Sequence, residues 1–260
     1  MVVSILFVAY CLLFILSLWL KDNSIADVFW GIGFMILAGG SFCYSLREIP
    51  NYLLTGLILL WWLRISTHIG SRKWKEPKED PRYAKWREEW GSWWYFYIRS
   101  FLQVYMLQMI LMLVVALPIF VLNLWLWNME HGLLRSSQRF DQIPIIVWAI
   151  FALLGLLFET IADYQLGEFI KIKKPWEIFT TGLYHYSRHP NYFGESVFWL
   201  GISLMGVSYS YFSLIWWGAI TFLLLFVSGV PLQEARYAGR PNWEEYKKKT
   251  SVFIPWIPKK

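Results

Sequence analysis

The chain alternates between long apolar runs and short polar segments, which is the pattern of a polytopic membrane protein. A helix crosses the bilayer core with about 20 mainly apolar residues, and seven stretches approach that length. We predict transmembrane spans at approximately 2–20, 25–46, 50–70, 95–122, 143–169, 192–207 and 212–232. The segments between them show no strand pattern, internal repeat or separate soluble domain. The expected fold is all-α, with one membrane domain over residues 1–260.

Composition supports this prediction and narrows the function classes. Apolar residues make up 57% of the chain and charged residues 16%, against roughly 25% charged in a typical soluble protein. These values exclude a disordered chain, a disulfide scaffold and an ordinary soluble enzyme. Cys11 and Cys43 lie in apolar runs without metal-ligand spacing, and His185 and His189 have no nearby carboxylate or thiol ligands. We therefore expect no metal site.

The distribution of basic residues predicts the orientation. Nineteen Lys and Arg residues fall in the polar segments 21–24, 71–92, 170–191 and 233–260, and three fall in the alternate segments. Basic loops stay on the cytoplasmic side, so the N-terminus is expected outside and the C-terminal tail in the cytoplasm. This bias explains the net charge of +6 without nucleic acid. With no targeting signal recognised, we expect a bacterial inner membrane.

Charged groups inside spans mark candidate functional positions. Asp27 is either an acid satisfied by the start of its helix or a protonated carboxyl that donates to a carbonyl oxygen. Arg64, His68 and Arg72 recur every four residues on one helical face. They line a pocket or, more simply, extend towards the headgroups.

The densest polar segment runs from residue 182 to residue 195 and precedes an apolar span. Arg188 and His189, followed by Pro190 at a helix start, would make an anion site there. Further polar groups occur in the pair Glu159 and Asp163, in the turn 79–83 and in the tail from residue 233. No glycine-rich phosphate loop is present.

The segment 182–195 and the tail that ends in Phe-Ile-Pro resemble the steroid 5α-reductase superfamily, in particular its bacterial branch of uncharacterised membrane proteins. An Asp-Val-Phe-Trp sequence at 27–30 and a Glu-Asp-Pro-Arg-Tyr loop at 79–83 extend the resemblance. It covers the chain from about residue 25 onwards. The resemblance implies seven transmembrane helices and reduction of a carbon–carbon double bond conjugated to a carbonyl, with NADPH held by the cytoplasmic segments 71–92, 170–191 and 233–260.

The resemblance also implies site residues. On the substrate side, Asp27 matches the family's glutamate and Trp61 stands where the family has a tyrosine, so both are expected to act on the carbonyl. Two departures on the cofactor side are Glu159 in place of asparagine and Gln233 in place of histidine. The residues expected to contact the cofactor are Arg64, His68, Arg72, Arg82, Tyr83, Asp163, Tyr164, Lys171, Tyr184, Arg188, His189, Asn191, Tyr192, Glu195, Arg236 and Tyr237.

The resulting hypothesis is an NADPH-dependent reductase that transfers hydride to the β-carbon of a lipophilic enone or enal, with Asp27 polarising the carbonyl. Arg72, Arg82, Lys171 and Arg188 are the candidates for phosphate contacts. The expected partners are the lipid substrate, which enters from the bilayer, and membrane lipids. Neither nucleic acid nor an obligatory protein partner is indicated.

Two other classes stay open. The segment 188–192 and the tail also resemble isoprenylcysteine carboxyl methyltransferases, which bind S-adenosylmethionine. Three features argue against methyl transfer, because members of that group are usually shorter and lack them. These features are Asp27, the helical face formed by Arg64, His68 and Arg72, and the long basic segment 71–92. A transporter would be expected to show repeats or discontinuous helices, and the sequence shows neither.

Overall fold

The computed structural model describes residues 1–75, 78–91, 93–130, 142–207 and 210–259, of which 71–75, 93 and 125–130 are described by their backbone only. These residues form two compact units, Met1–Arg139 and Phe140–Lys260. Each unit is described by itself. The described residues are helical throughout, apart from turns, loops and one isolated β-bridge between Ser187 and Ser251.

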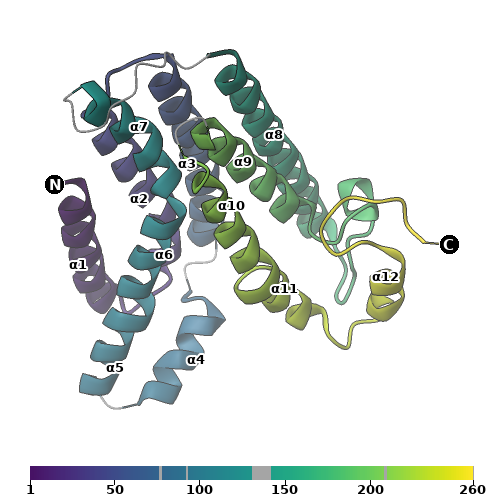
Figure 1. Cartoon of the computed structure of the whole chain (residues 1–260). Helices are drawn as coiled ribbons and strands as arrows, with labels where there is room; N and C mark the ends of the chain where they lie inside the picture. Colours follow the sequence, from purple (N-terminus) through teal and green to yellow (C-terminus); the bar gives the residue numbers. More distant parts are fainter. Residues whose placement is uncertain (76–77, 92, 131–141, 208–209, 260) are drawn as a thin grey trace. The chain divides into compact units, whose positions relative to one another are not determined.

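The first unit consists of helices (Figure 1). In chain order they are α1 (Val2–Leu20), α2 (Ile25–Phe42), α3 (Ile49–Lys75), α4 (Pro81–Trp90), α5 (Trp93–Arg99), the π-helix η1 (Ser100–Met106), α6 (Leu107–Val115) and α7 (Leu117–Glu130).

The second unit is also helical and ends in an extended tail. Its elements are α8 (Gln142–Ile172), the 3-10 helix η2 (Gly182–His185), α9 (Pro190–Val207), α10 (Ser213–Phe222), the π-helix η3 (Leu223–Val227), α11 (Val230–Tyr237) and α12 (Trp243–Lys249).

Six helical segments in the described part of the chain are long and apolar enough to cross a bilayer. They are Val2–Leu20, Ile25–Phe42, Ile49–Gly70, Trp94–Val115, Gln142–Ile172 and Ser213–Tyr237. The chain is therefore an all-helical, multi-pass membrane protein. The remaining predicted span, 192–207, is helical as α9 but is not among the six. The count of seven and the orientation stay predictions.

The predicted fourth span, 95–122, is divided in the structure. The helix that could cross the membrane ends at Val115, the chain turns at Ala116, and α7 begins at Leu117. Pro118 follows at the second position of α7, where its missing N–H costs no helical hydrogen bond. Uniform hydropathy across this stretch hid the turn, because apolar residues continue on both sides of it.

Helices α2 and α3 pack closely and run antiparallel. The Phe34 ring meets the Trp61 ring edge to face at 5.2 Å, and nearer the other end Phe42 meets Tyr52 at the same distance. A Cβ on Gly31 would lie 2.6 Å from the Ser66 Oγ, so the glycine permits this approach. The antiparallel register places the start of α2 at the level of the last turns of α3.

Close glycine contacts also join α8 to α9. A Cβ on Gly194 would lie 2.6 Å from the backbone nitrogen of Glu159, and one on Gly155 would lie 2.4 Å from the backbone nitrogen of Phe198. The two backbones can approach only because both positions lack a side chain. As a result, the acidic end of α8 lies against the first turns of α9.

Candidate functional site

A cluster of polar side chains surrounds Asp27 in the first turn of α2. Its carboxylate accepts hydrogen bonds from Arg82 Nη2 at 2.8 Å, from the Tyr83 hydroxyl at 2.7 Å and from Gln108 Nε2 at 3.2 Å. Gln108 Nε2 also donates to the Tyr83 hydroxyl at 3.0 Å. The prediction that a protonated Asp27 donates to a carbonyl does not fit this geometry, because a carboxyl that faces three donors, one of them a guanidinium, acts as an acceptor.

Helix α4 supplies two of these donors from its first turn. Asp80 caps α4 and accepts from both the backbone nitrogen and Nε of Arg82, which fixes the direction of the guanidinium. Tyr83 is only 3% exposed. Burial, followed by the charge of Asp27, raises the pKa of Tyr83 well above its usual value, so this hydroxyl keeps its proton.

A second ion pair holds the start of α4 against the turn between α1 and α2. Arg87 donates to both carboxylate oxygens of Glu79, at 3.0 and 2.8 Å, and Glu79 accepts from the backbone nitrogen of Asn23 at 2.8 Å. Ser100 donates to the Asn23 side chain at 3.0 Å. The loops predicted to share one membrane face, 21–24 and 71–92, thus meet directly within this unit.

Three buried polar atoms near this cluster have no hydrogen-bond partner among the described residues. They are the hydroxyl of Tyr10 in α1, the Oε1 of Gln108 and the Nδ2 of Asn23. Tyr10 is fully buried, its ring meets Phe29 edge to face at 5.1 Å, and the charge of Asp27 acts on it. Buried donors and acceptors without partners make this cluster a candidate for contact with polar atoms of a ligand.

The remaining predicted residues of the first unit lie along α3. Trp61 is fully buried against Phe34. Arg64 is half-buried and His68 exposed, and both interact with neighbouring groups. The α2–α3 register places His68 near the level of Asp27. The side chain of Arg72 lies outside the described residues.

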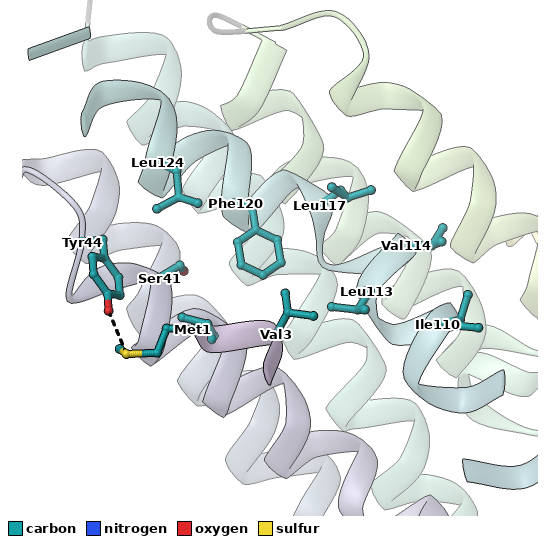
Figure 2. A pocket seen from close by; sticks show the side chains of 11 residues that line it. Met1, Val3, Ser41, Tyr44, Ile110, Leu113, Val114, Leu117, Phe120 and Leu124 are labelled. Carbon is teal, nitrogen blue, oxygen red and sulfur yellow. Dashed lines mark hydrogen bonds between the residues drawn. The ribbon is translucent and has the colours of Figure 1, made fainter. Parts of the chain in front are cut away.

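An apolar pocket of about 640 Å³ opens at the far end of α2 (Figure 2). Side chains from α1, α6 and α7, among them Val3, Leu113 and Phe120, line it together with Ser41 and Tyr44. Ser41 is 14 residues from Asp27, or ~21 Å along a helix. This pocket is therefore separate from the polar cluster.

In the second unit, the α8–α9 contact brings predicted cofactor residues together. Asn191 Nδ2 donates to Asp163 Oδ1 at 3.1 Å. Tyr192 forms a side-chain hydrogen bond with Gln233, and the charges of Glu195 and Arg236 act on it.

Tyr184 lies close to this group. It is 6% exposed, and its hydroxyl has no hydrogen-bond partner in the part of the chain that the structure describes. Burial raises the pKa of the Tyr184 hydroxyl above its ordinary value. The nearby charge of Asp163 adds to this shift, with smaller contributions from Tyr237 and Tyr192. An unsatisfied buried hydroxyl beside a carboxylate–amide pair fits a polar ligand such as a nucleotide cofactor.

Arg188 and His189 occupy a different environment from the predicted anion site. Arg188 Nε donates to Glu234 at 2.9 Å, and its Nη1 donates to the carbonyls of Lys247 and Thr250. His189 is 6% exposed, and burial lowers its pKa to about 4. A guanidinium engaged by its own chain and a neutral imidazole do not favour the predicted phosphate contact.

The other predicted cofactor residues lie nearer the surface. Tyr164 is 68% exposed, and Lys171 is exposed and paired with Glu168. The Tyr237 ring stacks on Trp243. Within the described residues, no group of three or more metal-ligating side chains comes together.

Sequence reasoning missed four residues that build these clusters. Gln108 is an isolated amide in an apolar span, and the rule applied to charged residues there would have found it. Tyr10 has no such signal, since tyrosine is common in membrane helices. Glu234 and Arg87 lie in polar segments where ordinary surface charges are also expected.

One comparison with known proteins shows the family, and none gives an activity. Residues 13–250 match the family model described as "Protein of unknown function (DUF1295)". The chain is 24% identical over 271 residues to an uncharacterised protein of Schizosaccharomyces pombe, covering 92% of this chain and 74% of that protein. No solved structure matches.

Proposed function

The chain belongs to the DUF1295 family, and we propose that it is an integral-membrane reductase that uses NADPH to reduce the double bond of a lipophilic α,β-unsaturated carbonyl compound. Support comes from two kinds of observation. The motifs at 182–195 and in the tail resemble the steroid 5α-reductase superfamily, and the polar cluster in the first unit suits a carbonyl oxygen.

The uncommitted hydroxyl of Tyr10 is the observation that carries the substrate side of the proposal. Reduction of an enone places negative charge on the carbonyl oxygen, so the site needs a donor with a free proton. Tyr83 already donates to Asp27, whereas Tyr10 is buried without an acceptor among the described residues. We assign the donor role to Tyr10, in place of Asp27.

Asp27 then has a positioning role. It holds Tyr83 and Arg82 in fixed directions, while Arg82 balances its negative charge. This arrangement orients a carbonyl group beside Tyr10, with the charge of Arg82 already taken up by Asp27 and Asp80. Trp61 of α3 is fully buried and adds an apolar surface. Its indole does not transfer a proton to the substrate.

On the cofactor side, the candidates are the polar residues around the first turn of α9. Tyr184, Asp163, Asn191, Tyr192 and Arg236 would hold polar groups of the nucleotide. When bound, NADPH would supply the hydride for the β-carbon, and the reduction would be balanced by one proton taken up from the medium at the α-carbon. The basic segments of the chain favour binding of its phosphates.

Transfer of deuterium tests this proposal directly. The purified protein in nanodiscs is incubated with NADPH deuterated at C4 and with a steroid enone, a polyprenal or a long-chain 2-enoyl thioester. The proposal expects deuterium at the β-carbon of at least one saturated product, located by mass spectrometry. Tyr10→Phe should lower kcat about 100-fold, the loss typical for one oxyanion donor. Deuterium in no product, or full activity of Tyr10→Phe, contradicts it.

The same purified protein can be assayed for methyl transfer, the alternative function. Incubation with S-adenosylmethionine labelled in its methyl group and a prenylated cysteine methyl acceptor would yield a labelled ester if the alternative function were correct. No structural observation favours that reaction, because Asp27, Arg82 and Tyr83 form a cluster that methyl transfer does not require.

A further inference from the structure

The C-terminal tail is fixed to the second unit by a series of backbone contacts. Arg188 N donates to the Ser251 carbonyl at 2.8 Å, and Trp256 N donates to the Tyr186 carbonyl at 2.9 Å. The Ser187 hydroxyl donates to the Phe253 carbonyl at 2.7 Å. In Figure 1 the tail is the yellow segment that follows α12. The tail therefore packs as an ordered part of the second unit.

These contacts divide the tail into an inner and an outer face. The Phe253 side chain points inward, is 9% exposed and meets Phe193 of α9 edge to face at 5.7 Å. The outward side chains are large and apolar: Ile254 is 60% exposed, Trp256 72% and Ile257 77%. Such a cluster of exposed apolar groups on a fixed segment indicates an interaction surface.

The level of this surface relative to α8 identifies its partner. About twenty residues from Ile143, or ~30 Å of helix, span the hydrocarbon core and end near Ala162. The Asp163–Asn191 hydrogen bond therefore lies near the edge of the core. The tail packs against residues 184–189, just before α9, at the same end of the unit. That level corresponds to the headgroup region, where Trp side chains concentrate.

Charge around the tail favours anionic headgroups. The segments 170–178 and 243–259 contain seven lysines and three glutamates. Arg240, three residues before the second segment, donates through Nη1 to the Glu177 carbonyl of the first at 3.5 Å. The Lys259 backbone nitrogen donates to the Lys249 carbonyl, so basic residues flank the apolar tail. Lysine side chains near an anionic lipid surface are attracted to it.

We propose that the tail surface formed by Ile254, Trp256 and Ile257 inserts into the headgroup region of a bilayer that contains anionic phospholipid. This contact would hold residues 184–189, and the start of α9 after them, at a set depth. The inference does not depend on the proposed reaction.

Site-specific fluorescence tests this inference in the full chain. Cys11 and Cys43 are replaced by alanine, and single cysteines at Ile254 or Ile257 are labelled with an environment-sensitive nitrobenzoxadiazole dye. The protein is placed in nanodiscs of phosphatidylcholine with or without phosphatidylglycerol. The matched control is Glu244→Cys on α12, where the glutamate side chain is 73% exposed.

We expect blue-shifted emission at 254 and 257, and at least twofold stronger quenching by lipids with a nitroxide near the headgroup than at 244. Phosphatidylglycerol should increase that quenching. Quenching at 257 equal to that at 244 overturns the proposal. Blue-shifted emission without lipid quenching also overturns it, because protein would then cover the surface. Equal quenching with and without phosphatidylglycerol overturns the role of the lysines.

Discussion

Replacing Tyr83 by phenylalanine removes the hydroxyl that links α4 to Asp27. The variant loses the 2.7 Å hydrogen bond to the Asp27 carboxylate and the 3.0 Å bond from Gln108. Because Tyr83 is only 3% exposed, water cannot readily replace the hydroxyl. The partner change, Asp27→Asn, keeps the side-chain shape but removes the charge that the donors face.

The expected loss follows from these contacts. A hydrogen bond to a charged group contributes about 1.5–3 kcal/mol and a neutral one about 1 kcal/mol. The Asp27 side chain is 26% exposed, so solvent screening places the first value near its lower end. We expect Tyr83→Phe to lower the free energy of unfolding by about 2 kcal/mol. The double variant should lose about 1.5 kcal/mol less than the sum of the two single variants.

Unfolding of the purified variants in mixed micelles measures these differences. Tyr52→Phe is the control, since Tyr52 lies in the same unit and is 56% exposed; its loss should stay below about 0.5 kcal/mol. If Tyr83→Phe costs no more than this control, or if the two changes simply add, the hydrogen bond between Tyr83 and Asp27 is not what holds α4.

Three further predictions concern other parts of the chain. Gly194→Ala should lower the free energy of unfolding by about 2 kcal/mol or more, because its Cβ would meet the α8 backbone at 2.6 Å. The control Gly167→Ala, with nothing within 4 Å, should be neutral or stabilising by up to about 1 kcal/mol. Equal thermal stabilities of the two variants would refute the close approach. Burial lowers the pKa of His189 from 6.5 to about 4, against the opposing effect of Glu234 and with a smaller contribution from Arg188. The unfolded chain therefore binds this proton first, and stability should fall by up to about 3 kcal/mol as the pH drops from 6.5 to 4; a His189→Gln variant with the same pH dependence would contradict this. Asn123 is fully buried and links Asn51 to Ser41, so Asn123→Ala should cost about 1–3 kcal/mol in unfolding experiments, and an unchanged midpoint would show that the network is dispensable.

Hydropathy predicted the helices well because the bilayer imposes one length and one composition on each span. It failed at Ala116, where the chain turns inside an apolar run. Charge counting predicted that the segments 21–24 and 71–92 share a face, and the contact between Asn23 and Glu79 shows that they meet.

The composition of the site was less predictable than its location. Asp27 was found from its charge, but its partners depend on how α4 folds back, which spacing does not reveal. Gln108 follows the π-helix η1, whose wider turn changes which residues face α2. Arg188 looked like an anion ligand because its engagement by Glu234 and by tail carbonyls arises from contacts 46 to 62 residues away.

Ligand-dependent thermal stability tests the central claim most directly. The detergent-purified protein is unfolded by heat in the presence of NADPH, NADH or S-adenosylmethionine. Each ligand is present at about 100 times the dissociation constant expected for proteins that bind it. Selective binding at that excess adds about 2.7 kcal/mol to the folded state. A reductase of the proposed kind should be stabilised by NADPH, with Asn191→Ala and Tyr184→Phe reducing the shift. Stabilisation by S-adenosylmethionine and not by NADPH would contradict the account.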